Sequence, residues 1–367
     1  MPKTYRVAVF GRTGKGDYGH GVDVCWLDHP QTEVVAVADE NPDGRAAAAK
    51  RLGVNCAFAD YVEMLNEVKP DILAIGPRWI DQHRDATVAA GERGVHVFME
   101  KPFCRTLEEA DEIITTCERT HTKVAIAHPT RYSPIISTVK GLLREGAIGN
   151  VLELRARGKE DRRGGGEDLW VLGSHMLDLS LALGYDPEWC FASVLQGGEP
   201  IRREHVAEGA EGIGPLAGDA VRATYGLKQG ITMTWQSYRN QGGDPRRYGL
   251  QIFGSKGIME IVEGSLPEVH ILQDSSWSPG RSGKSWEKVT TAGIGQPEPL
   301  SGKETGHRHL YAIDDLLSAI EDQREPKCSM YEGRRIVEMI AAVFESVRVG
   351  QPVSFPLETR VNPLTLL

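Results

Sequence analysis

Short apolar runs alternate with amphipathic segments over the first third of the chain. The runs occupy residues 7–10, 34–38, 72–75, 95–99 and 124–127. Runs of this length without polar alternation are typical of strands buried on both faces of a parallel sheet. Between the last two runs, apolar residues recur at helical spacing behind Thr106 and Glu109, which form a capping box. The pattern predicts a Rossmann-type, doubly wound parallel sheet over residues 1–127.

A second domain is predicted over residues 128–367, where the pattern changes. Residues 151–159 alternate apolar and charged positions, as in a strand with one exposed face. Further strand signals follow, and then apolar stripes at helical spacing over 310–320 and 336–344. We therefore predict an α+β domain in which helices cover one face of a large, open, mostly antiparallel sheet. Another subunit should bury the uncovered face, so we expect a homo-oligomer, a dimer or a tetramer.

Composition and charge argue against several classes of protein. A net charge of −9 over 367 residues disfavours general nucleic-acid binding, which usually needs a basic face. No apolar run is long enough to span a membrane, and the first residues lead into a strand without a signal-peptide core. The six cysteines form neither a Cys-x-x-Cys pair nor a zinc-like pattern. We therefore expect reduced thiols, no metal site and a cytoplasmic protein.

Four glycines follow the first predicted strand: Gly11, Gly14, Gly16 and Gly19. The last three match G-x-G-x-x-G, a spacing that lets backbone amides approach a pyrophosphate at a helix N-terminus. The fingerprint usually begins at the strand end, which here is Gly11. Either the loop is longer than usual, or the pyrophosphate uses Gly11 and a different subset. A glycine-rich turn without a ligand is the alternative to both.

Asp39 ends the second predicted strand. An acidic residue at this position accepts hydrogen bonds from the adenosine ribose and repels a 2′-phosphate. The next residues offer no arginine for that phosphate. The sequence therefore favours NAD as the cofactor over NADP. The alternative is that Asp39 caps the N-terminus of the following helix.

Glu100, Lys101 and Pro102 stand directly after the apolar run at 95–99. Proline restricts its own φ and the backbone of the residue before it, so Lys101 should be held at a strand end. Open α/β sheets bind ligands at this edge. A partly desolvated lysine there can polarise an alcohol oxygen or help move its proton. A surface lysine paired with Glu100 is the alternative interpretation.

A second signature begins at 164–166, where three consecutive glycines precede His175 and Asp178. On a helix, Val171, His175 and Asp178 share one face. Histidine titrates near neutrality, as a proton acceptor for an alcohol should. A buried histidine that serves packing alone is the alternative.

Together, the glycine loop, the Glu-Lys-Pro corner and the His-x-x-Asp helix resemble the Gfo/Idh/MocA family of sugar and polyol oxidoreductases, over nearly the whole chain. The resemblance implies that Lys101 orients the reacting hydroxyl and that His175 accepts its proton. It also implies further site residues around the cofactor and the substrate. Near the cofactor these are Gly76 and Glu100; near the substrate they are Arg131, Asp168 and Asp178.

This chain departs from the family at Val171, where many members carry an aspartate one helical turn before the histidine. The carboxylate must then come from elsewhere or be unnecessary. Glu167, Asp168 and Asp178 are the local candidates, and Asp178 ranks first because it shares the face of His175.

The predicted function is NAD-dependent hydride transfer at a secondary alcohol of a sugar, glycoside or cyclic polyol. One alternative is redox-neutral glycoside cleavage through a transient keto intermediate, which uses the same residues. The other is a non-catalytic sensor of a nucleotide or a sugar. The presence of Lys101 and His175 favours an enzyme, whereas the absence of an aspartate at 171 mildly favours a sensor.

Overall fold

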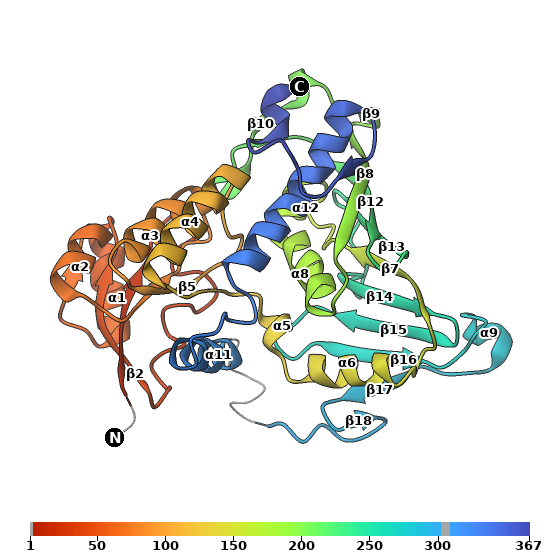
Figure 1. The fold of residues 1–367 in the computed structure, drawn as a ribbon, viewed down its shortest axis with the longest axis horizontal. Coiled ribbons are helices and arrows are strands. Elements are labelled where there is room, and N and C mark those ends of the chain that lie inside the picture. Colours follow the sequence, from red (N-terminus) through yellow and green to blue (C-terminus); the bar gives the residue numbers. More distant parts are fainter. Residues whose placement is uncertain (1–2, 302–308) are drawn as a thin grey trace. The chain divides into compact units, whose positions relative to one another are not determined.

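A computed structural model describes residues 3–301 and 309–367 (Figure 1). The chain divides into two compact units. The first unit comprises Met1–His128, Ala210–Gly214 and His307–Val337; the second comprises Pro129–Gly209, Pro215–Gly306 and Glu338–Leu367. The first unit thus contains two later segments that the sequence pattern assigns to the second domain. One of them is tied to the first unit by a backbone hydrogen bond from Ile126 to the carbonyl of Cys328 (2.9 Å).

The first unit is built on a six-stranded parallel sheet with the order β3-β2-β1-β4-β5-β6. Its strands are β1 (Tyr5–Phe10), β2 (Thr32–Ala38), β3 (Ala57–Phe58), β4 (Ile72–Ile75), β5 (His96–Met99) and β6 (Val124–Ile126). The four residues of β4 are all buried, as expected for a strand covered on both faces. The order of the strands reverses between β1 and β4, the place where open α/β sheets bind ligands. The predicted Rossmann-type sheet is confirmed.

Helices connect the strands of this sheet. They are α1 (Pro42–Leu52), α2 (Tyr61–Val68), α3 (His83–Gly91), α4 (Leu107–Thr120) and the short 3-10 turn η1 (Ile80–Gln82); the unit also contains α11 (Leu310–Glu321) and the 3-10 turn η4 (Ala210–Gly212) from later in the chain. The Thr106 side chain caps α4 by accepting from the Glu109 amide (3.2 Å), as its sequence predicts. Asn41 caps α1 by accepting from the Gly44 amide (2.9 Å). Asp39 is therefore not the N-cap of α1.

The segment between β1 and β2 differs from the prediction. Residues 11–31, all of which the structure describes, form turns and one isolated β-bridge but no helix. The expectation that the glycine loop opens a helix is wrong. Glycine is among the poorest helix formers, and several glycines here have positive φ, including Gly19 (65°) and Gly21 (85°).

The second unit carries a sheet of eleven strands with the order β18-β17-β16-β15-β14-β7-β13-β12-β8-β19, and β9 pairs with β8. Its strands are β7 (Val151–Arg157), β8 (Pro187–Gln196), β9 (Glu199–Pro200), β12 (Ala220–Leu227), β13 (Thr232–Tyr238), β14 (Gly249–Gly254), β15 (Gly257–Val262), β16 (Glu268–Leu272), β17 (Glu287–Thr290), β18 (Gly293–Ile294) and β19 (Val353–Ser354). Among the described strand pairs of this sheet, β7 and β13 are parallel and the others are antiparallel. A separate pair joins β10 (Ala207–Glu208) to β11 (Pro215–Leu216).

Helices of the second unit lie on one side of this sheet (Figure 1). They include α6 (Ile135–Arg144), α8 (Ser174–Ala182) and α12 (Met330–Val349) from Glu338 onward. Shorter helices of this unit are α5 (Pro129–Tyr132), α7 (Gly166–Asp168), α9 (Pro279–Ser282), η3 (Arg203–His205) and η5 (Pro363–Leu366). The Tyr225 hydroxyl in β12 donates to the Met339 carbonyl of α12 (3.0 Å). In β12, buried Val221, Ala223 and Tyr225 alternate with more exposed residues. This alternation confirms the predicted sheet with one covered face.

The opposite face of the sheet is largely polar. A row of residues in register crosses six strands, from Thr224 in β12 through Thr234, Arg155, Gln251 and Glu260 to His270 in β16. Among the helices that the structure describes, none has the length and apolar character needed to cross a bilayer.

Candidate active site

The glycine loop forms a small hairpin at the carboxyl end of β1. Gly11 follows the strand directly, and Arg12 and Asp17 exchange two backbone hydrogen bonds of 3.0 Å each. Gly14 and Gly16 lie in the turn between them with φ of 85° and 83°. The G-x-G-x-x-G match therefore begins beyond the strand end, and which of these glycines contact a pyrophosphate stays a prediction. A side-chain carbon placed on Gly14 would meet no atom within 4 Å, so the tip of the loop is open to a ligand.

Asp39 fastens this loop to the end of β2. Its buried carboxylate accepts hydrogen bonds from the Thr13 amide (3.0 Å) and hydroxyl (2.7 Å), the Tyr18 hydroxyl (2.9 Å) and the Asn41 amide (2.9 Å). Burial and the Asp39 carboxylate raise the pKa of Tyr18, which keeps its hydroxyl a donor. A ribose would share Asp39 with these protein donors, so contact with ribose stays a prediction.

Gly19 brings the glycine loop onto the ends of two further strands. A Cβ at this position would lie 2.4 Å from the Gly76 carbonyl oxygen and 2.5 Å from Cγ of Glu100. Only glycine permits an approach this close. Gly76 follows β4 and Glu100 follows β5. The predicted cofactor-binding residues Gly19, Gly76 and Glu100 are therefore adjacent in the structure.

Glu100 is a buried carboxylate held in its charged form. It accepts from the backbone amide of His20 (2.8 Å), from Nδ1 of the same histidine (2.7 Å) and from the Lys101 amide (3.1 Å). Burial alone would raise the pKa of Glu100. The His20 hydrogen bond and the nearby Lys101 ammonium instead hold that pKa well below its usual range. Sequence reasoning did not identify His20.

Lys101 is buried, with 4% of its surface exposed, so it is not a surface lysine. The peptide bond between Lys101 and Pro102 is cis. His83, at the start of α3, connects this corner to the end of β4. Its ring nitrogens lie 2.7 Å from the Pro102 carbonyl oxygen and 2.8 Å from that of Pro77. Burial lowers the pKa of His83 although both carbonyls oppose the shift.

In the second unit, the glycine run at 164–166 lies directly on neighbouring backbone. A Cβ on Gly164 would lie 2.3 Å from Cα of Arg239, and one on Gly165 2.5 Å from the Gly218 carbonyl oxygen. Close packing against the ends of β12 and β13 therefore requires glycine here. This packing sets the direction of the turn that leads to α8.

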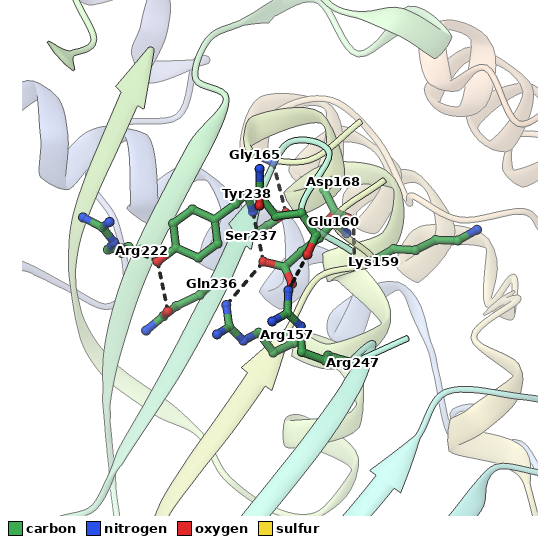
Figure 2. Close-up of polar contacts among 11 residues, drawn as sticks. Arg157, Lys159, Glu160, Gly165, Asp168, Arg222, Gln236, Ser237, Tyr238 and Arg247 are labelled. Carbon is green, nitrogen blue, oxygen red and sulfur yellow. Dashed lines mark hydrogen bonds and ion pairs between the residues drawn. The ribbon is translucent and has the colours of Figure 1, made fainter. Parts of the chain in front are cut away.

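Asp168 holds the end of β7 against β13 (Figure 2). Its buried carboxylate accepts from the Lys159 amide (3.2 Å), the Glu160 amide (3.0 Å) and the Ser237 hydroxyl (2.5 Å). Burial raises the pKa of Asp168 although these hydrogen bonds oppose the shift. These hydrogen bonds give Asp168 a structural role. Its predicted role in substrate binding stays a prediction.

His175 lies near the start of α8, after the π-helical turn η2 (Leu169–Gly173). Its side chain is buried, and Nδ1 lies 3.6 Å from Oε1 of Glu263. The Tyr248 ring stands perpendicular to the imidazole, at 85° and a centroid distance of 6.5 Å. Glu263 follows β15 and Tyr248 precedes β14. Sequence reasoning missed both, because no local spacing connects them to the histidine.

Asp178 faces Arg131 of α5. The Arg131 Nε donates to the Asp178 carboxylate (2.7 Å), and Nη2 donates to its backbone carbonyl (3.1 Å). Both side chains are almost fully buried. Glu263 lies within ion-pair distance of His175, whereas Asp178, the first-ranked candidate, binds Arg131; its part in the proton relay stays a prediction. Substrate contacts by Arg131 and Asp178 stay predictions.

Two family models match the chain. Residues 5–128 match the oxidoreductase family with an NAD-binding Rossmann fold, and residues 140–355 match the C-terminal alpha/beta domain of the same family. The chain belongs to the Gfo/Idh/MocA oxidoreductase family. The resemblance seen in the sequence is thereby confirmed, and so are the predicted NAD cofactor and the oxidoreductase class.

Named relatives extend over most of the chain. Levoglucosan dehydrogenase from Pseudarthrobacter phenanthrenivorans is 22% identical over 87% of this chain and 89% of its own length. D-glucoside 3-dehydrogenase from Escherichia coli is 23% identical over 95% and 97%. A solved structure of levoglucosan dehydrogenase with NADH and levoglucosan superposes with a TM-score of 0.76 at 19% identity, covering 97% of this chain and all of the other. The superposition confirms the fold.

The described residues of the first unit fit NAD. The open tip of the glycine loop and the carboxyl ends of β1, β2 and β4 form the edge where a dinucleotide lies in this topology. The loop and Asp39 would hold its phosphates and adenosine ribose, and contact of Gly76 with the cofactor stays a prediction. NAD supplies the hydride acceptor when it is bound. The protein must then orient an alcohol and remove its proton.

Proposed function

We propose that this enzyme transfers a hydride between NAD and a secondary alcohol of a sugar, glycoside or cyclic polyol. The observation that carries the proposal is Lys101, a buried lysine next to an ionised buried glutamate at the carboxyl end of β5. A cation so placed suits a polar, uncharged hydroxyl substrate. Relatives named for levoglucosan and for glucosides support this substrate class.

In the proposed reaction, Lys101 polarises the substrate hydroxyl and His175 accepts its proton. The C–H electron pair leaves carbon as hydride for the nicotinamide, and a ketone remains. Each residue contributes by position and charge, because a proton-transfer group acts only within hydrogen-bond reach of the oxygen.

The test is a panel of sugars, glycosides and inositols incubated with purified enzyme and NAD. We expect NADH to accumulate with at least one class of substrate. Cleavage of a glycoside without net NADH would support the redox-neutral alternative instead. Tight NAD binding without turnover of any compound would support a sensor.

We also propose that the enzyme is a homo-oligomer that buries the outward face of the eleven-stranded sheet. Phe191 in β8 pairs with Thr224 on this face, and its side chain is 47% exposed. An exposed aromatic among polar residues suits a subunit contact. Light scattering should show a dimer or tetramer, and Phe191→Asp should reduce the mass. A wild-type monomer at micromolar concentration would contradict this proposal.

A cytoplasmic location is the last part of the proposal. It is supported by the six cysteines, all of which lie in the described residues and none of which forms a disulfide. Fractionation of the native cells, followed by immunodetection, would test it.

A further inference from the structure

His175 and Glu263 bring two ionisable side chains together inside the second unit. The His175 side chain is 3% exposed and that of Glu263 is 15% exposed, and the distance from Nδ1 to Oε1 is 3.6 Å. Oε1 of Glu263 is buried and accepts no hydrogen bond within the described part of the chain. A buried acceptor without a donor is costly. The imidazole N–H is the group placed to satisfy it.

The backbone on either side of Glu263 is anchored. Gly249 and Val262 are paired across β14 and β15, and the Glu263 amide lies 3.4 Å from the Tyr248 carbonyl oxygen. The next residue, Gly264, is tied to α5, because the Thr130 hydroxyl donates to its carbonyl (3.0 Å). The position of Glu263 is therefore set by the sheet and by α5.

The histidine is held equally well from its own side. The Tyr248 hydroxyl donates to the Leu172 carbonyl (2.8 Å), one helical turn before His175. A Cβ on Gly173 would lie 2.7 Å from the Trp235 ring, so the start of α8 lies directly on β13. π-Helical turns are rare and occur frequently at functional sites. These contacts hold the start of α8 in place, and with it the backbone that carries the His175 imidazole.

Two other carboxylates near α8, Asp178 and Asp168, bind partners of their own. Asp178, further along the helix, binds Arg131 at 2.7 Å. Asp168 holds the turn at the end of β7. The Tyr248 ring also stands against the imidazole, and its hydroxyl donates to the Leu172 carbonyl. Glu263, with Oε1 3.6 Å from Nδ1, is a carboxylate placed to act on His175.

We propose that Glu263 orients His175 and stabilises its imidazolium during proton transfer, so that no aspartate is needed at position 171. The inference rests on the proposed function. In oxidation, the substrate O–H bond breaks and its proton goes to Nε2 of His175. The C–H electron pair goes to NAD as hydride, and Nδ1–H donates to Glu263. Glu263 is a positioning residue, because it acts through the histidine. Catalytic hydrogen bonds are often long before substrate binds, so 3.6 Å fits this role.

The sign of the effect follows from charge. An anion within a few ångströms favours the charged imidazolium and raises its pKa by about 1 to 3 units. Glu263→Gln should therefore lower the pKa of His175 by about 1 unit. The acid limb of the pH profile for oxidation should shift to lower pH by the same amount. Plateau turnover should fall by about tenfold or more, because the imidazolium formed in the transition state loses its counter-charge.

Glu260→Gln is the matched control. It removes the same charge from the same strand pair, but Glu260 faces outward and binds Gln251 (2.8 Å). It should change neither the pKa of His175 nor the acid limb. Glu263→Asp keeps the charge. It should retain part of the turnover, and the pKa of His175 should stay close to its wild-type value.

The decisive measurement is an NMR titration of the histidine ring protons in the whole enzyme, with His175 assigned from a His175→Ala variant. A lower pKa for His175 in Glu263→Gln, but not in Glu260→Gln, supports the inference even if no sugar is oxidised; only the proposed function would then fail. An unchanged pKa overturns the inference even if the enzyme is an active sugar dehydrogenase. If Glu263→Gln does not fold, Glu263→Asp is measured instead. The inference is overturned if Glu263→Asp keeps wild-type turnover although the pKa of its His175 has moved toward that of free histidine.

Discussion

Glu100 in the first unit and Asp168 in the second are both buried carboxylates, yet their surroundings differ. Glu100 accepts from a histidine side chain and stands beside a lysine, and its pKa is held well below the usual range in spite of burial. Asp168 accepts from two backbone amides and a serine hydroxyl, and burial raises its pKa. Similar burial therefore accompanies opposite shifts, because among the described residues cationic neighbours lower the pKa of Glu100 and none is found to lower that of Asp168.

The difference separates a charged site from a structural one. Glu100 keeps a negative charge where the proposed catalytic lysine needs a counter-ion. The Asp168 carboxylate accepts hydrogen bonds from Lys159, Glu160 and Ser237 (Figure 2). A neutral carboxyl could still accept some of these hydrogen bonds. Burial by itself identifies neither role. The charge of the donors around a buried acid is what distinguishes them.

The largest expected effect tests the cation beside Glu100. Lys101→Met should lower turnover by about 100-fold, the usual scale for a positioned proton-transfer group. Binding of NAD, measured by fluorescence titration, should survive because the glycine loop is unchanged. Lys159→Met, beside the Asp168 turn, is the control and should retain activity. Near-full activity in Lys101→Met would reduce Lys101 to a structural role.

The next effect concerns stability. Glu100→Gln should lower the free energy of unfolding by about 2 kcal/mol, because the His20 donors lose their charged acceptor inside the protein. Urea denaturation at neutral pH measures this loss. Glu108→Gln removes an exposed charge from the first turn of α4 and should change stability by less than about 0.5 kcal/mol. If the two variants lost the same free energy of unfolding, the surroundings of Glu100 would contribute nothing to stability.

A third buried carboxylate, Asp39, extends the comparison to the cofactor. The enzyme should prefer NAD to NADP by at least about tenfold in kcat/KM, or roughly 1.4 kcal/mol. Asp39→Ala should narrow this ratio and raise KM for both cofactors, because Thr13 and Tyr18 lose the acceptor that holds the loop. Glu40→Gln, an exposed neighbour, should leave the ratio unchanged. Equal use of the two cofactors by the wild type would contradict the prediction.

The smallest expected effect is that Glu100 and Asp168 change the pH dependence of stability in opposite directions. The lowered pKa of Glu100 contributes stability above the ordinary glutamate pKa, and this contribution is lost as pH falls towards the folded-state value. The raised pKa of Asp168 does the reverse: its contribution is present below the ordinary aspartate pKa and is lost as pH rises through the folded-state value. On acidification, the stability advantage of wild type over Glu100→Gln should shrink, and that over Asp168→Asn should grow. Parallel changes in the two variants would refute the assignment of opposite shifts.

Much of the fold was predictable because its signals are local. Apolar runs place the strands of the first unit, and Thr106 with Glu109 places the start of α4. Glu100 and Lys101 are neighbours in the chain, so their pairing at a strand end could be inferred directly. The helix expected after the glycine loop was wrong, because the fingerprint implies a helix that the glycines themselves disfavour.

The sequence by itself determined the family, the parallel and antiparallel sheets, and the lysine and histidine proposed for catalysis. Only the tertiary structure decided what surrounds each of them. Glu263 meets His175 through the pairing of β14 and β15, Asp178 turns to Arg131, and Asp39 binds the glycine loop. Periodicity describes neighbours along one element. The partner of a buried charge is chosen by the packing of elements far apart in the chain, and that packing leaves no local pattern in the sequence.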